Sequence, residues 1–204
     1  MKLLSVPLML LLLAAAQAQE GPNRPEPKPV TLDGKTTAVV VMDLHTRCHD
    51  PQQICSKLMP GLGEFLEKAR ASSVSIIYTV SPEEKGKPSA EIATPLKRRE
   101  GEPVIYPRGY DKFMGGERGE ELQDLLKQRG IKSVVLAGAS AHTTVLHSAT
   151  TAARIYSYNV IIPMDGTISR SNYEYEYTFH HLSVIPGGAN KLVQFTKLSM
   201  ISFQ

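Results

Sequence analysis

The sequence predicts an α/β fold, a three-layer α/β/α sandwich around a mostly parallel, Rossmann-like central sheet. Apolar, β-branched runs at residues 37–42, 74–80 and 132–137 are typical of strands that are buried on both faces. Segments with apolar residues at helical spacing alternate with these strands, and this order favours a parallel sheet covered on both sides. A chain of 204 residues, 42% of them hydrophobic, is long enough for one domain with a substantial core.

Two segments precede the folded domain, which we place at residues 36–204. Residues 1–18 predict a signal peptide, because a lysine and an apolar run are followed by the small-x-small pattern Ala16-Gln17-Ala18. The apolar run is short for a membrane span, and an uncleaved anchor is the alternative. Residues 19–35 are rich in proline and predict an extended arm without packed structure. We therefore expect a secreted or periplasmic protein with no membrane attachment after cleavage.

Within the domain, the expected elements alternate along the chain. The strand at 37–42 is followed by a helix at 58–71, the strand at 74–80 and a polar excursion at 81–101 that contains three prolines. The remaining expected elements are a short strand at 103–106, a helix at 117–129, the strand at 132–137, a helix at 143–155, a strand at 159–163, a helix at 173–182 and a last strand at 191–196.

Candidate functional residues follow the strands, because sites of open α/β sheets form at the carboxyl ends of the strands. Asp43 comes directly after the first buried strand, and a carboxylate beside an apolar core needs a partner or a function. The alternative is that Asp43 only caps a turn. In the same way, Thr143 and Thr144 could simply cap the start of the next helix.

Two segments carry a resemblance to a known family. VVVMD at 39–43 and GASAHTTVLHSATTAARIYSYNVIIPMDGTIS at 138–169 together resemble the isochorismatase-like cysteine hydrolases. The resemblance implies the fold given above, with Asp43 as acid or base. It places the nucleophilic cysteine of the family six residues after Gly138, where this chain has Thr144.

The resemblance also implies a lysine a few residues before a phenylalanine. With Phe113 as the anchor, that position falls at Pro107 or Arg108, so Arg108 is the expected source of positive charge and could orient an anion. Lys112 is the alternative candidate, which we interpret as a lysine of a solvent-facing loop.

Further residues near the strand ends are expected to contact a small-molecule substrate: His45, Phe113, Ser140 and His142. The cluster of His45 and His49 with two neighbouring aspartates offers nitrogen and oxygen ligands for a metal ion as an alternative. Pro51 disfavours the helix that would bring these histidines together. We therefore expect neither a bound metal nor a cofactor.

The threonine in the cysteine position leaves two functions open. A hydroxyl is a poorer acid than a thiol, and even a proton transfer from cysteine to aspartate is uphill by about 6 kcal/mol before the site assists. Threonine nucleophiles rely on a stronger base than a carboxylate. The chain is therefore either a hydrolase of a small amide or related C–N or C–O bond, or an inactive descendant that binds a ligand or partner. In the hydrolase, Asp43 is the acid/base, His142 or Thr144 assists it, and Arg108 orients an anion.

The remaining expectations concern bonds and partners. Cys48 and Cys55 could form a local disulfide in an exported chain, and two free thiols are the alternative. The net charge of +3 is spread along the chain, so we expect no nucleic-acid partner. Tyr173, Tyr175 and Tyr177 suggest an aromatic interface, and with the family resemblance they predict a homo-oligomer.

Overall fold

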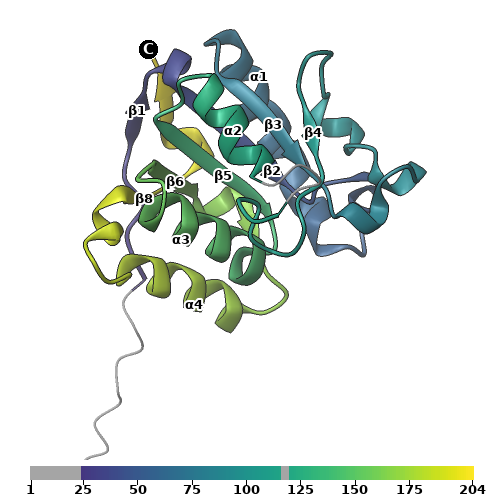
Figure 1. The fold of residues 1–204 in the computed structure, drawn as a ribbon. Helices are drawn as coiled ribbons and strands as arrows, with labels where there is room; N and C mark the ends of the chain where they lie inside the picture. Colours follow the sequence, from purple (N-terminus) through teal and green to yellow (C-terminus); the bar gives the residue numbers. More distant parts are fainter. Residues whose placement is uncertain (1–23, 116–119) are drawn as a thin grey trace, which may run out of the picture.

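The computed structural model describes residues 24–115 and 120–204, and Figure 1 shows their arrangement. The predicted signal peptide at 1–18 and the first part of the predicted arm lie outside these residues. Helices flank both faces of a central parallel sheet, which confirms the predicted three-layer α/β/α fold.

The central sheet has the strand order β4-β3-β2-β5-β6-β8, and β7 pairs with the carboxyl end of β5. Every pairing in it is parallel within the described residues. Its strands are β2 (Thr37–Met42), β3 (Ser75–Thr79), β4 (Val104–Ile105), β5 (Ser133–Ala139), β6 (Asn159–Pro163), β7 (Thr167–Ile168) and β8 (Val193–Thr196).

The central strand β2 shows why its sequence is apolar throughout. Val40 and Met42 belong to the core on one face of the sheet, and Val39 and Val41 belong to the core on the other face. Both sides of the strand are therefore buried, as the continuous apolar run predicts.

The helices divide between the two faces. Helix α1 (Met59–Ala71) packs on one core, through residues such as Leu62 and Leu66. Three helices pack on the other core: α2 (Glu121–Gln128), α3 (Leu146–Arg154) and α4 (Asn172–Ser183). The predicted helix at 143–155 begins as a π-helical turn, Ala141–Val145, before it continues as α3.

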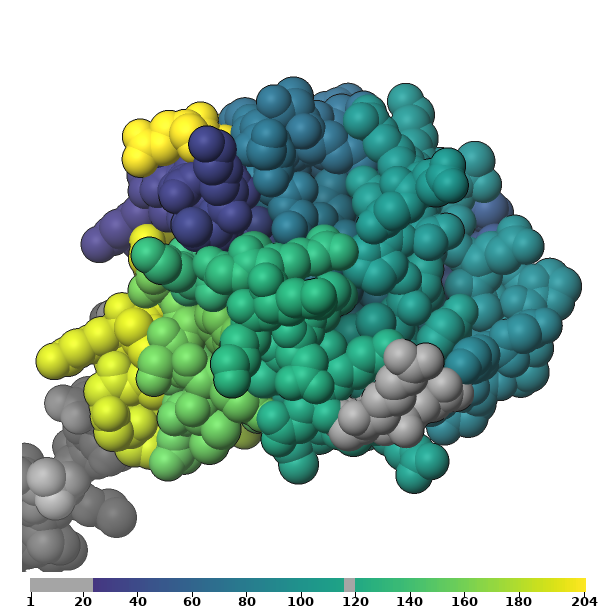
Figure 2. Space-filling model, turned by 45° about the horizontal axis from the view of Figure 1, so that its top comes forward, coloured from purple at the N-terminus to yellow at the C-terminus, as the bar shows by residue number. Residues whose placement is uncertain are grey.

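The structure differs from the prediction that the arm at 19–35 is not packed. Its described part is extended, yet it packs against the domain: β1 (Val30–Leu32) pairs with β9 (Ile201–Phe203), and Lys28 N–H donates to the Phe195 carbonyl at 2.8 Å. Figure 2 shows this purple segment against the yellow C-terminal residues. The proline pattern predicts extended backbone but not the strand partner, which lies at the other end of the sequence.

None of the helices in the two described stretches is both long and apolar enough to cross a membrane.

Candidate functional site

Three polar side chains meet at the carboxyl ends of β2 and β5. The Lys112 ammonium nitrogen lies 2.9 Å from Asp43 Oδ2, and the Thr144 hydroxyl donates to the same oxygen at 3.3 Å. Lys112 and Thr144 are buried, whereas the Asp43 side chain is 22% exposed. Asp43 and Thr144, which the strand-end rule predicts at this rim of the sheet, are brought together there by the structure.

The backbone around Asp43 is fixed by β3 and β5, the strands on either side of β2. Asp43 N–H donates to the Thr79 carbonyl at 2.9 Å, and its φ of 56° lies in the left-handed region. On the neighbouring strand, a Cβ on Gly138 would lie 2.1 Å from the Met42 carbonyl oxygen, so only glycine allows this approach. The Ala139–Ser140 peptide that follows is cis. Residues of β5 therefore sit directly against the chain that presents Asp43.

The two oxygens of the Asp43 carboxyl group have different surroundings. Oδ1 is buried without a hydrogen-bond partner among the described residues, whereas Oδ2 is the oxygen that Lys112 and Thr144 contact. Burial raises the pKa of Asp43 above 3.8, and the ammonium of Lys112 and the hydroxyl of Thr144 oppose part of that increase. Asp43 is therefore closer to an acid/base that works near neutral pH than an exposed aspartate is.

Helix α3 holds the loop that carries Lys112. The buried Ser148 hydroxyl accepts from Lys112 N–H at 3.0 Å. One turn further along, the Thr151 hydroxyl donates to Asp111, whose other carboxylate oxygen accepts from Phe113 N–H at 2.9 Å. The helix that begins next to Thr144 thus also fixes the lysine that contacts Asp43.

These contacts correct the predicted position of the positive charge. Arg108 is exposed, and its backbone N–H donates to the Gly115 carbonyl at 2.9 Å. Lys112, which we interpreted as solvent-facing, contacts Asp43 instead. Phe113, expected to bind substrate, is buried in the core, where its ring lies 5.5 Å from that of Tyr156. The apolar Phe113 turns inward to the core, and Lys112 next to it turns toward the sheet edge.

An open cavity of about 590 Å³ adjoins the three residues, within the usual size range for small-molecule sites. Ser140 lies in its wall, with its hydroxyl 3.2 Å from that of Thr143. The lining residues are Asp43, Arg47, Ser81, Glu83, Gly109, Tyr110, Lys112, Ala139, Ser140, Thr143, Thr144 and Arg170. Sequence reasoning missed Arg47 and Arg170, because neither belongs to a recognised motif.

His45 and His142, both expected to contact substrate, are not among the lining residues. The backbone of His45 pairs with that of Ile92, burial lowers the pKa of its imidazole below 6.5, and its Nδ1 has no hydrogen-bond partner in the described chain. His142 turns away from the cavity, and its Nδ1 lies 3.0 Å from the Ser169 hydroxyl. The structure therefore does not place either histidine in the wall of this cavity.

The cysteines lie beside this rim. Cys48 and Cys55 form a disulfide that links two short 3-10 turns, Thr46–His49 and Ile54–Leu58. His49 accepts from Thr94 N–H at 2.9 Å. Across residues 24–115 and 120–204, no group of three or more His, Cys, Asp or Glu side chains is placed to hold a metal ion.

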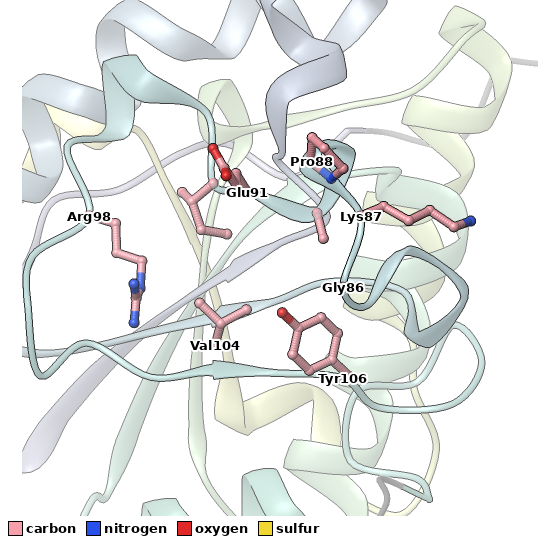
Figure 3. Close-up of a pocket in the computed structure, with 9 residues that line it drawn as sticks. Gly86, Lys87, Pro88, Glu91, Arg98, Val104 and Tyr106 are labelled. Carbon is pink, nitrogen blue, oxygen red and sulfur yellow. The ribbon is translucent and has the colours of Figure 1, made fainter.

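A second, larger cavity of about 660 Å³ lies over the edge strand β4, between the 86–92 loop and Val104 (Figure 3). Tyr106 points its hydroxyl into this space, and Arg98 uses its Nε to donate to the Glu102 carbonyl at 2.9 Å. This cavity shares no lining residue with the first. Of these two cavities, the one beside Asp43 is the candidate functional site, because it contains a partly buried carboxyl group with a raised pKa beside a buried amine.

Comparisons with known proteins identify the family of the domain and match its fold. The sequence model described as the Isochorismatase domain matches residues 37–190. The secreted isochorismatase effector Isc1 of Verticillium dahliae is 27% identical over 152 residues, which cover 70% of this chain and 77% of that protein.

Solved structures share the fold. An isochorismatase family protein from Desulfovibrio vulgaris superposes with a TM-score of 0.68 at 19% identity, covering 80% of this chain and 95% of the other. An N-carbamoylsarcosine amidase from Thermoplasma acidophilum gives a TM-score of 0.64 at 20% identity, with 80% and 96% covered.

Proposed function

The chain belongs to the isochorismatase domain family, and on this premise we propose that it is an exported hydrolase in which Asp43 acts as acid and base on a C–N or C–O bond of a small molecule. The observation that carries the proposal is the contact of one carboxylate oxygen, Oδ2 of Asp43, with both Lys112 and Thr144 at the wall of a cavity.

The proposed reaction needs no covalent intermediate. For an amide, Asp43 takes a proton from a water molecule, and the water oxygen attacks the carbonyl carbon. The C–N bond then breaks, and Asp43 returns the proton to the leaving nitrogen, so that an acid and an amine are formed. The raised pKa of Asp43 favours the second step, because a carboxyl group with a higher pKa is a stronger base and holds the accepted proton more readily until it is returned.

Lys112 has a supporting role in this proposal. Its buried ammonium group favours the ionised form of Asp43, which has to exist before a proton can be accepted. Thr144 acts as a hydrogen-bond donor to Asp43 and not as the attacking group, since a carboxylate is too weak a base for an alcohol.

A screen of small amides, ureides and enol ethers, with wild type and Asp43→Asn compared, tests the proposal. Turnover of at least one compound by wild type, reduced about 100-fold or more in Asp43→Asn, is expected. Equal turnover by both proteins would exclude Asp43 as the acid/base.

A second function is favoured by one observation, the threonine at the position where the family resemblance places a cysteine. In that case the chain binds a small ligand or a partner without turning it over. Saturable binding of a compound in the cavity without any turnover across the screen would support this alternative.

Location and assembly belong to the same proposal. The predicted signal peptide and the secreted relative support export, to the periplasm or outside the cell. Tyr173 is 79% exposed, and its ring stacks on that of Tyr177 with centroids 6.4 Å apart, so this face of α4 is the proposed homo-oligomer contact. Tyr175, by contrast, packs inward on Phe179.

A further inference from the structure

The cavity beside Asp43 is lined by three cations that differ in their partners. Lys112 lies 2.9 Å from the Asp43 carboxylate, and Arg47 lies 2.9 Å from the Glu84 carboxylate. Arg170 also lines the cavity, but its guanidinium group makes no ion pair or hydrogen bond with any residue that the structure describes. Two of the three positive charges are thus matched within the protein, and the third is available to a ligand.

The position of Arg170 is fixed by its backbone. In the pairing of β7 with β5, Ile168 lies opposite Ala139, so the chain leaves β7 next to Ser140 and the start of the π-helical turn. Arg170 N–H donates to a carboxylate oxygen of Glu174 at 3.1 Å, and that same oxygen accepts from Ser171 N–H at 3.1 Å. Arg170 therefore starts from an anchored point on the cavity rim and not from the middle of a free loop.

His142 links this rim to the turn that carries Thr144. Its Nδ1 lies 3.0 Å from the Ser169 hydroxyl and 3.6 Å from the Glu174 carboxylate. His142 N–H also donates to Ser169, at 3.3 Å. The distance between Thr144 and the Arg170 backbone is therefore set by packed contacts, as specificity for ligand length requires.

We propose that Arg170 is the specificity residue of this site and that it pairs with a carboxylate at the end of the substrate remote from the bond that Asp43 acts on. A guanidinium group presents a planar fork of donors that matches a carboxylate in two parallel hydrogen bonds. The inference rests on the proposed function only for the location of the reacting bond.

The second carboxylate of the cavity lining restricts the ligand further. Glu83 lines the same cavity and accepts a hydrogen bond from the Ser81 hydroxyl. It contributes a negative charge, which disfavours a ligand with two or more negative charges. The expected substrate class is accordingly a small amide or ureide with a single carboxylate.

The test uses a matched set of probes and the full chain. Binding of malonamate, succinamate and glutaramate is measured by isothermal titration calorimetry beside that of the corresponding neutral diamides. Wild type is expected to bind at least one acid about 10- to 100-fold more tightly than its diamide, because a charge-assisted bidentate pair is lost in the diamide. Arg170→Gln is expected to bind acid and diamide equally.

Arg154→Gln is the matched control, because Arg154 is exposed at the other end of α3. It should keep the preference of wild type for the acid. Equal affinity of acids and diamides for wild type, no binding of any acid, or an acid preference that survives in Arg170→Gln would each overturn the inference.

The outcome is separate from that of the proposed catalysis. If Asp43→Asn and wild type turn over every compound at the same rate, the acid/base proposal fails. The Arg170-dependent preference for carboxylates would still be measurable by calorimetry in both proteins.

Discussion

Lys112 Nζ lies 2.9 Å from Asp43 Oδ2, although the two residues belong to loops that follow different strands of the sheet. The lysine is almost completely buried, with 2% of its side chain exposed, and this carboxylate is the partner of its ammonium group. The pair, together with Thr144, defines the candidate site.

The first prediction concerns the ionisation of Asp43. Lys112→Met removes the cation that favours the carboxylate, so the pKa of Asp43 should rise further above 3.8. Carbon-13 NMR of the aspartate carboxyl groups, recorded as a function of pH, measures this pKa directly. Lys127→Met, a change on α2 outside the cavity lining, is the control and should leave the titration unchanged.

The same shift has a consequence for pH dependence. A rate that needs ionised Asp43 rises with pH through the Asp43 pKa, so its acidic limb should move to higher pH in Lys112→Met. For stability the sign is opposite: a raised folded pKa favours the protonated folded form, and the associated stability is lost as pH rises through that pKa. An acidic limb that stays in place or moves to lower pH would contradict the assignment of Lys112.

The second prediction concerns the support of Lys112 by α3. Ser148→Ala leaves the buried N–H of Lys112 without its acceptor and should lower the free energy of unfolding by about 1–3 kcal/mol. Urea unfolding gives this value. Thr150→Ala is the control, because its hydroxyl bonds only to the Leu146 carbonyl of the same helix, and it should change stability much less.

Of the three residues that meet at the site, the sequence predicts Asp43 and Thr144 but not Lys112. Asp43 is identifiable because a strand ends directly before it, and Thr144 because the family resemblance singles out the position six residues after Gly138. The spacing from Phe113 points to Arg108, and a loop lysine is usually exposed, so neither argument places Lys112 against Asp43. The fold of the 108–115 loop decides this, where Gly109 and Gly115 adopt positive φ and Arg108 N–H donates to the Gly115 carbonyl. The contacts of this loop with Ser148 and Thr151 of α3 join segments far apart in the sequence, and no local pattern signals them.

Most helices and strands can be predicted from the sequence, but the shortest strands cannot. Helices and buried strands were predicted to within a few residues, because their apolar periodicity reflects burial on the sheet. Strands β1 and β9 were not predicted, since each is three residues long and the pairing joins the two ends of the sequence. Arg170 carries no local signal, and its place at the cavity follows from the pairing of β7 with β5.

The third prediction concerns residue 144. Thr144→Cys places a thiol next to a carboxylate that can accept its proton, and this variant should gain turnover of small amides relative to wild type. Turnover and the rate of alkylation by iodoacetamide are the measurements, both as a function of pH. Thr143→Cys, whose neighbour is Ser140 and not Asp43, is the control and should gain no turnover. If the thiol at 144 reacts no faster than the one at 143, Asp43 does not activate a nucleophile at position 144, and the prediction fails.

The fourth prediction concerns the disulfide. The bond closes a loop between residues seven positions apart, and chain entropy gives such a short loop about 2–3 kcal/mol of stability. Reduction with a phosphine should lower the free energy of unfolding by that amount. The double variant Cys48→Ala/Cys55→Ala should be insensitive to the phosphine, and a wild-type protein with the same insensitivity would contradict the prediction.

The left-handed backbone conformation of Asp43 lowers the stability of the fold. A side chain at a φ of 56° costs stability that glycine would not, by about 1 kcal/mol, and this cost falls on a partly desolvated carboxyl group. Replacing Asp43 by glycine would remove this cost together with the carboxyl group. The gain in unfolding free energy of such a variant therefore measures how much stability the fold gives up to hold a carboxyl group at the end of β2.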